Sequence, residues 1–176
     1  MSHISEFRAA KDEFFRDDEQ SPLSQEQQAD FQGLNYYPED AAYDVRAWVE
    51  PLDAPEPVTL ITSRGTAQQF YRIGRLHFKL DGTPQQLTLF QDAEGQYLFL
   101  PFTDATSGQE TYGAGRYVEV EDGGSEGERQ IVRIDFNQAY NPYCAYNEAW
   151  VCPIPPAENR LTVPIRAGEK MFHAEE

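Results

Sequence analysis

The chain is 176 residues long and has a net charge of −16, from 30 acidic and 14 basic residues. A surface this acidic repels nucleic-acid phosphates and anionic lipid headgroups, so we expect neither nucleic acid nor a membrane as a partner. No apolar run approaches the roughly 20 residues that a membrane-spanning helix needs. The stretch 1–8 lacks the apolar core of a signal peptide, which favours a cytoplasmic protein.

The basic residues include only three lysines, Lys11, Lys79 and Lys170. Two interpretations fit this composition. One is an ordinary acidic bacterial protein. The other is a halophilic protein, because a carboxylate-rich, lysine-poor surface stays hydrated in high salt while its self-repulsion is screened.

The length suits a single domain over residues 1–176, with a helical segment at 1–35 and a β-rich body at 40–170. Apolar residues recur at three- and four-residue intervals from Ile4 to Phe15, which predicts a helix over 4–18.

A second, short helix is predicted to begin after Ser24. Gln27 stands three residues later, in the spacing of a capping box, and Gly33 marks the end. We expect both helices to pack on a sheet rather than to form a separate domain.

From Tyr43 onward the apolar period changes to two, which is typical of strands. The proline-rich run 51–57 predicts a loop, and the acidic, glycine-rich run 121–128 predicts a mobile hairpin tip. The predicted strands are 43–50, 58–63, 67–78, 87–91, 96–102, 115–120, 130–136 and 161–165. Eight or nine short strands predict a mainly β (α+β) fold, an antiparallel β-barrel or sandwich with two N-terminal helices packed on it.

The loop 103–116 is rich in glycine and hydroxyl groups and ends on Arg116. Its glycines lack the spacing of a P-loop or a dinucleotide fingerprint, so no cofactor is predicted. One interpretation is a polar or anion pocket, in which Arg116 supplies a forked cation and Ser107 or Thr111 supplies a hydroxyl. The other is a hydrogen-bonded hairpin loop in which Arg116 pairs with Asp104 or Asp135.

Asparagines and prolines crowd the stretch 135–160. Rigid loops that carry polar groups are common binding sites, which makes Asn137, Asn141 and Asn159 candidates for orienting a ligand. Tyr140 belongs to a group of rings that can stack a flat ligand, although such rings in a β-protein more often pack in the core or its rim.

Two cysteines, Cys144 and Cys152, stand eight positions apart. Buried free thiols are the first interpretation, a redox-formed bridge the second, and a zinc site the third, since no histidine shows ligand spacing. Nothing near Cys144 in sequence promises to lower its pKa, so a nucleophilic role has little support. His77, on a predicted strand, is an equally weak general base.

Carboxylates can also pair across a cleft and divide acid and base roles. Five carboxylates fall in or near these stretches, and in a chain with 30 acidic residues such proximity also arises by accident. They are Asp104, Asp135, Glu148, Glu158 and Glu169. The weak candidates for catalysis are therefore Glu158, Asp104 and Cys144.

The stretches 135–146, 152–161 and 167–170 resemble the family named domain of unknown function 1684, a group of prokaryotic proteins. Thr106-Ser-Gly108 and 111–117 also match the pattern of that family. Tyr143 departs from it, since the family commonly has a second proline after Asn-Pro. The resemblance covers nearly the whole chain and implies a single-domain, prokaryotic protein, with no substrate attached.

Two hypotheses follow. The first is a pocket for a small polar or anionic metabolite at one end of the barrel, with or without catalysis. The second is a structural or interaction protein whose asparagines and prolines only lock crossing loops together. The sequence predicts no oligomeric state. The expected pocket walls are Asp104, Ser107, Tyr112, Arg116, Asn137, Tyr140, Asn141, Cys144, Glu158 and Asn159.

Overall fold

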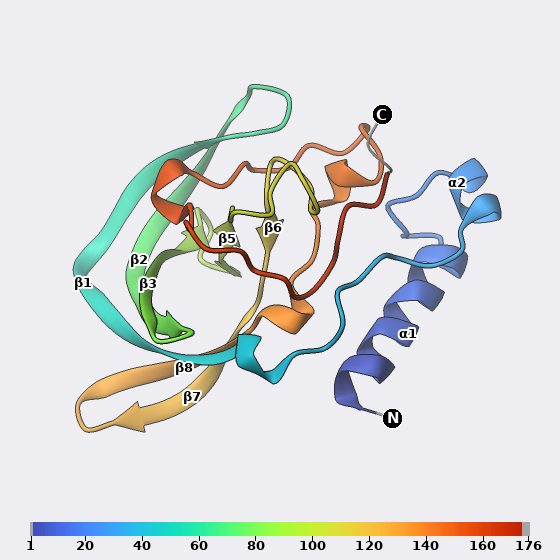
Figure 1. The fold of residues 1–176 in the computed structure, drawn as a ribbon. Coiled ribbons are helices and arrows are strands. Elements are labelled where there is room, and N and C mark those ends of the chain that lie inside the picture. The colour runs from blue at the N-terminus through green and yellow to red at the C-terminus, as the bar shows by residue number, and fades with distance from the viewer. Residues whose placement is uncertain (1, 174–176) are drawn as a thin grey trace.

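A six-stranded antiparallel sheet dominates the computed structural model, which describes residues 2–173. The strand order is β4-β3-β2-β1-β8-β7, and the sheet curls into an open half-barrel (Figure 1). A second sheet pairs two short strands, β5 and β6. The strands are β1 (Asp44–Ile61), β2 (Ala67–Leu80), β3 (Thr83–Asp92), β4 (Leu98–Phe99), β5 (Pro101–Phe102), β6 (Arg116–Tyr117), β7 (Val120–Glu126) and β8 (Arg129–Asp135). The predicted mainly β, antiparallel fold is confirmed.

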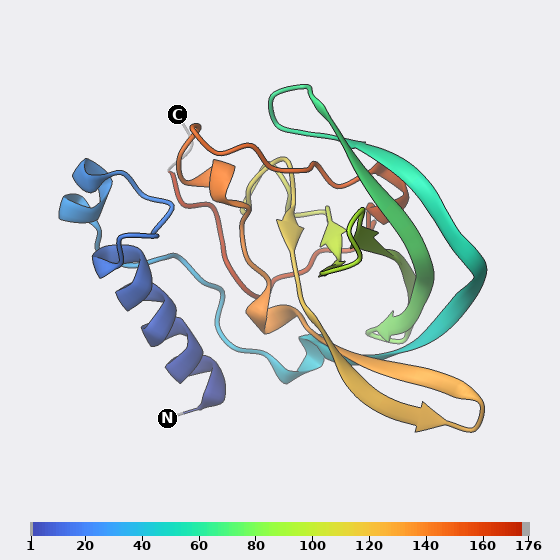
Figure 2. The same cartoon turned by 180° about the vertical axis from the view of Figure 1, so that it is seen from behind.

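Irregular segments at 103–115 and 136–173, here called the loop layer, cross the open side of the curled sheet (Figures 1 and 2). The main core lies between the two. Leu76, Leu87 and Ile134 face it from the sheet, and Phe136 and Ile165 face it from the loop layer. The four short 3-10 helices are Ala41–Tyr43, Phe136–Gln138, Tyr143–Ala145 and Ala157–Asn159.

The helical segment joins the body through the loop layer. Helices α1 (His3–Asp17) and α2 (Gln25–Asp30) lie beside that layer, on the side away from the sheet (Figure 2). Phe15 of α1 is buried against Tyr146, with the ring centroids 4.9 Å apart. The predicted capping box is confirmed, since Ser24 and Gln27 exchange both hydrogen bonds at the start of α2.

The predicted loop at 51–57 is wrong. These residues lie inside the long strand β1, which pairs with β2 on both sides of a register shift between Pro51 and Glu56. Proline has no N–H to donate to a ladder and is tolerated where a strand is irregular. The three prolines therefore mark a break in pairing within β1, not an end of the strand.

The predicted strand at 161–165 is also wrong, because the segment runs through the loop layer without ladder partners on a sheet. Its backbone groups form isolated hydrogen bonds instead of a continuous ladder. Leu161 donates to the Thr103 carbonyl at 2.8 Å, and Val163 accepts from Ala105 at 3.1 Å. The predicted hairpin tip at 121–128 is shorter than expected, since β7 extends to Glu126.

Candidate functional site

Arg116 lies inside the loop layer and is 1% exposed. Its guanidinium donates hydrogen bonds to the backbone carbonyl oxygens of Ile165 at 2.8 Å, Ala167 at 2.6 Å and Glu169 at 3.0 Å. Burial lowers the pKa of Arg116, and the nearby carboxylate of Asp104 opposes that shift. One arginine thus supplies the donors that a neighbouring strand would give to residues 165–169.

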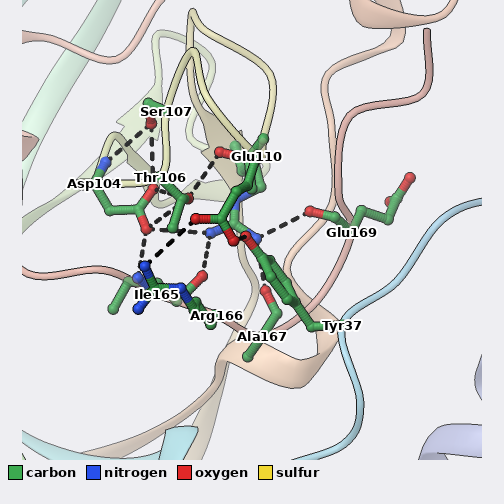
Figure 3. A network of polar contacts seen from close by, with 11 residues as sticks. Tyr37, Asp104, Thr106, Ser107, Glu110, Ile165, Arg166, Ala167 and Glu169 are labelled. Carbon is green, nitrogen blue, oxygen red and sulfur yellow. Dashed lines mark hydrogen bonds and ion pairs between the residues drawn. The ribbon is translucent and has the colours of Figure 1, made fainter. Parts of the chain in front are cut away.

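Asp104 completes this network from the other side (Figure 3). Its carboxylate lies 3.6 Å from the Arg116 guanidinium and accepts hydrogen bonds from Thr106, Ser107 and the backbone amide of Ile165. Every one of these partners belongs to the protein itself. The structure therefore has the Arg116–Asp104 pair that the sequence leaves as one of two alternatives.

A glycine makes this approach of the chains feasible. Gly115 has a φ of +113°, and a Cβ atom built there would lie 2.6 Å from the carbonyl oxygen of Phe102. That distance is far inside van der Waals contact. A side chain at position 115 would therefore push β6 and Arg116 away from the loop layer.

Two buried asparagine side chains form hydrogen bonds with backbone groups. The Asn159 side chain pairs with both the N–H and the C=O of Thr88, at 2.9 and 2.8 Å, and donates to Pro101 at 2.8 Å. The Asn137 side chain pairs in the same way with the N–H and C=O of Asp40, at 2.9 Å each. Each amide side chain therefore replaces a backbone partner where the ladder stops.

Asn141 and Glu169 connect the loop layer to α1. Asn141 donates to the carbonyl of Lys170 at 3.0 Å, and its backbone amide donates to the Glu169 carboxylate at 3.3 Å. Glu169, 1% exposed, also pairs with Lys11 of α1 and accepts from the Tyr146 hydroxyl. The buried carboxylate is thus neutralised by a helix that is distant in sequence.

Glu158, in the 3-10 helix Ala157–Asn159, is held in an ion pair with Arg72 of β2. Arg72 donates to it through Nε at 3.0 Å and Nη2 at 2.8 Å, and Thr88 donates at 2.9 Å. Burial raises the pKa of Glu158, but the hydrogen bonds from Arg72 and Thr88 lower it below its ordinary value. An ionised, paired carboxylate is poorly suited to donate a proton.

The two thiols lie together at the edge of the loop layer. The backbone amide of Cys144 donates to the Cys152 sulfur at 3.2 Å, and the Tyr112 hydroxyl is 3.7 Å from the Cys144 sulfur. Over residues 2–173, no cluster of three or more histidine, cysteine or acidic side chains is arranged to hold a metal ion. The Tyr112 hydroxyl thus contacts a thiol of the protein itself.

A separate cleft of about 630 Å³ opens between the β3–β4 hairpin, the start of β2 and the loop layer. We call it the ring cleft, because five aromatic side chains line it together with three carboxylates. None of its lining residues is a lysine, arginine or histidine. The rings are Phe70, Tyr97, Phe99, Tyr117 and Tyr140, and the carboxylates are Asp92, Glu94 and Glu119.

The rings of the cleft support one another. Phe99 stacks on Phe70 with centroids 5.1 Å apart and meets Tyr117 edge-on at 4.8 Å. Tyr117 meets Tyr140 edge-on at 5.9 Å, and the two residues exchange backbone hydrogen bonds at 2.8 and 2.9 Å. These contacts fix most of the cleft wall before any ligand arrives, while Tyr97 stands 66% exposed at the rim.

The predicted pocket residues divide among several places. Tyr140 lines the ring cleft, and Asp104 and Ser107 line a separate polar cleft of about 320 Å³. Arg116, Asn137, Asn141 and Asn159 are at most 3% exposed and line neither cleft. In the described part of the chain, Arg116 Nε and Asn141 Oδ1 have no hydrogen-bond partner.

Sequence reasoning missed most of the ring cleft. The two-residue period places Phe70, Phe99 and Tyr97 on strands and gives no reason to single them out. One signal was available: Tyr97 is the second residue after the turn 92–95, and a tyrosine near a hairpin tip has little core to enter. The buried pair of Glu169 with Lys11 had no such signal, because 158 positions separate the two residues.

In residues 2–173, none of the helices is both long enough and apolar enough to cross a membrane.

The comparisons with known proteins give a family and a fold. A family model described as "Protein of unknown function (DUF1684)" matches residues 29–170. The solution NMR structure of an uncharacterised protein from Haloarcula marismortui is similar, with 38% sequence identity and a TM-score of 0.72. The match covers 95% of this chain and 91% of that one. No curated protein matches the chain.

Proposed function

We propose that this chain, which belongs to the DUF1684 family of proteins of unknown function, binds a small organic cation in the ring cleft. The observation that carries the proposal is the composition of the cleft wall, in which aromatic rings and carboxylates occur together without a basic residue. The ligand class is an amine or a quaternary ammonium compound.

The rings supply the first part of the binding energy. An aromatic face attracts a cation within about 6 Å of its centroid, and this is worth about 0.5–1 kcal/mol at exposed sites and about 2 kcal/mol when the cation is desolvated. Tyr97 stands 66% exposed at the rim of the cleft, where a ligand first meets the wall. Tyr140 is half-buried, with the Lys11 Nζ 5.1 Å from its ring centroid, and Phe99 is a half-buried apolar part of the wall.

The carboxylates supply the second part. Glu119 accepts a hydrogen bond from the Tyr140 hydroxyl at 2.6 Å, which holds the carboxylate beside a ring of the cleft. Asp92 is held in a turn by the backbone amides of Gln96 and Tyr97, at 2.7 Å each. A cation at this site meets rings and negative charge at once.

The charge of the cleft argues against the anionic ligand that the sequence suggests. That expectation depends on Arg116 as a free cation, and the guanidinium is buried against Asp104 and three carbonyl oxygens. An anion in the ring cleft would meet three carboxylates and no basic side chain. A neutral polar ligand would lack the cation–π attraction that favours a charged one.

Calorimetric titration with choline tests the proposal. Choline should bind about fivefold or more tightly than its neutral isostere, in which carbon replaces the quaternary nitrogen, because about 1 kcal/mol of cation–π attraction is lost. Acetate should not bind. Equal binding of choline and the isostere would contradict the proposal.

Variants locate the binding. Tyr97→Ala and Glu119→Gln should each weaken choline binding about fivefold, since each removes one contact worth about 1 kcal/mol. The matched control is Tyr71→Ala, because Tyr71 is a 37% exposed tyrosine on β2 next to Phe70 and lies outside the cleft wall. The control variant should bind choline as the wild type does.

The paired asparagines favour a second role, which is to lock the loop layer onto the sheet. Asn137 and Asn159 satisfy backbone groups, and Arg116 satisfies three carbonyl oxygens. Such a role needs no ligand at these residues. It is compatible with cation binding in the ring cleft, and the stability measurements described in the Discussion test it.

A further inference from the structure

Cys144 and Cys152 form a pair of thiols that the proposed binding role does not use. Cys144 lies in the 3-10 helix Tyr143–Ala145, and Cys152 begins the proline-rich segment that follows. The Cys144 amide donates to the Cys152 sulfur at 3.2 Å. Both thiols are free.

The turn between β1 and β2 forms hydrogen bonds with the backbone of Cys152. The Cys152 amide donates to the Ser63 hydroxyl at 3.2 Å, and the Ser63 amide donates to the Cys152 carbonyl at 2.9 Å. Cys152 is therefore fixed on both sides of its backbone. Tyr112, on the opposite side, places its hydroxyl 3.7 Å from the Cys144 sulfur.

The two thiols differ in exposure and in charge. Cys152 is 8% exposed, whereas Cys144 is half-buried and reaches solvent. A hydrogen bond with the Cys152 thiol lowers the pKa of Cys144 to about 6; hydrogen bonds with Tyr112 and Ser63 act in the same direction, and burial opposes them. The same thiol–thiol contact and burial raise the pKa of Cys152.

This asymmetry is what thiol–disulfide exchange requires. The attacking group is a thiolate that solvent can reach, and the second thiol must lie beside it to resolve the mixed disulfide. We propose that Cys144 and Cys152 are a reversible dithiol–disulfide site that reacts with low-molecular-weight disulfides, with Cys144 as the attacking sulfur and Cys152 as the resolving one.

The reaction has two balanced steps. The Cys144 thiolate attacks one sulfur of the small disulfide, forms a mixed disulfide and expels the other sulfur as a thiolate. Cys152 then gives its proton to the released thiolate and attacks the Cys144 sulfur, which expels the second small sulfur as a thiolate. That thiolate takes from solvent the proton that Cys144 lost when it ionised. The protein loses two electrons and two protons, and the small disulfide is reduced to two thiols.

Incubation of the reduced full-length chain with oxidised glutathione tests this. Mass spectrometry should show the wild type losing two hydrogen atoms, with a peptide bridge between Cys144 and Cys152. Cys152→Ser should stop at a glutathione adduct on Cys144. Cys144→Ser should react about tenfold more slowly, because the remaining thiol is buried and a small disulfide cannot readily reach it.

Two results would overturn the proposal. One is a wild type that accumulates the glutathione adduct without forming the bridge. The other is a Cys144→Ser variant that reacts as fast as Cys152→Ser.

If a serine variant fails to fold, an experiment on the wild type alone tests the role of Cys144. Its rate of alkylation by iodoacetamide, mapped by peptide, should rise with a midpoint near pH 6 at Cys144, because the thiolate is the reactive form. A midpoint at Cys144 in the range of an ordinary thiol, about 8.5, would contradict the assignment of Cys144 as the attacking sulfur.

Discussion

The Tyr140 hydroxyl donates a hydrogen bond to the Glu119 carboxylate at 2.6 Å, so one wall of the ring cleft joins an aromatic face to a negative charge. Burial and this hydrogen bond raise the pKa of Tyr140. The phenol therefore stays protonated and keeps donating to Glu119 over the ordinary pH range.

Tyr140 separates the role of the ring from that of the hydroxyl. Tyr140→Phe should bind choline within about twofold of the wild type, because a phenyl face also attracts a cation, whereas Tyr140→Leu should lose about fivefold. Calorimetry on the folded variants measures both. Equal losses for the two variants would mean that the hydroxyl, not the ring, carries the contact.

Removal of Arg116 should destabilise the fold severely. Arg116→Ala leaves Asp104 buried without its cation and three carbonyl oxygens without a donor, and breaking a buried pair in this way costs about 3–5 kcal/mol. The matched control is Arg72→Ala, which breaks the half-exposed pair with Glu158 and should cost about 1 kcal/mol or less. Urea unfolding gives both values, and a similar small cost for both variants would contradict the locking role.

Asn159 offers a second test of the loop layer. Asn159→Ala removes three hydrogen bonds to buried backbone groups, and we expect a loss of at least about 2 kcal/mol in the free energy of unfolding. Asn35→Ala is the control, because Asn35 is exposed and donates to a single carbonyl at 3.0 Å. A cost below 1 kcal/mol for Asn159→Ala would show that water replaces the lost partners.

The Glu158 ion pair predicts a pH dependence of stability. The folded-state pKa of Glu158 lies below its unfolded value near 4.5, so its stabilising contribution is present above that pH and is lost as the pH falls through the folded value. Glu158→Gln should flatten this part of the acid unfolding curve. Arg72→Gln should remove the same part, and a curve unchanged by either substitution would contradict the assignment.

Local patterns predicted the elements better than the contacts between them. The capping box at Ser24 and Gln27 and the strands of period two need only neighbouring residues, and the structure contains them. The prolines of β1 misled the prediction, because a proline in sequence does not show whether the ladder around it is already irregular.

The predicted strand at 161–165 is wrong for a related reason. Its alternating apolar residues have the period of a strand, but side chains from Arg116 and Asp104 satisfy Ile165 in place of a ladder. The spacing of apolar residues along the chain does not reveal hydrogen bonds from side chains that are distant in sequence. The sequence did indicate that Arg116 and the asparagines are unusual, and the structure shows what they touch.

Cation binding in the ring cleft can be tested directly by an NMR titration of the isotope-labelled chain with choline, read at assigned backbone amides. The largest chemical-shift changes should fall at Tyr97, Phe99, Tyr117 and Tyr140. Tyr97→Ala should weaken them, and Tyr71→Ala should not. Changes centred on other residues, or none at millimolar choline, would contradict the assignment of the ring cleft as a cation site.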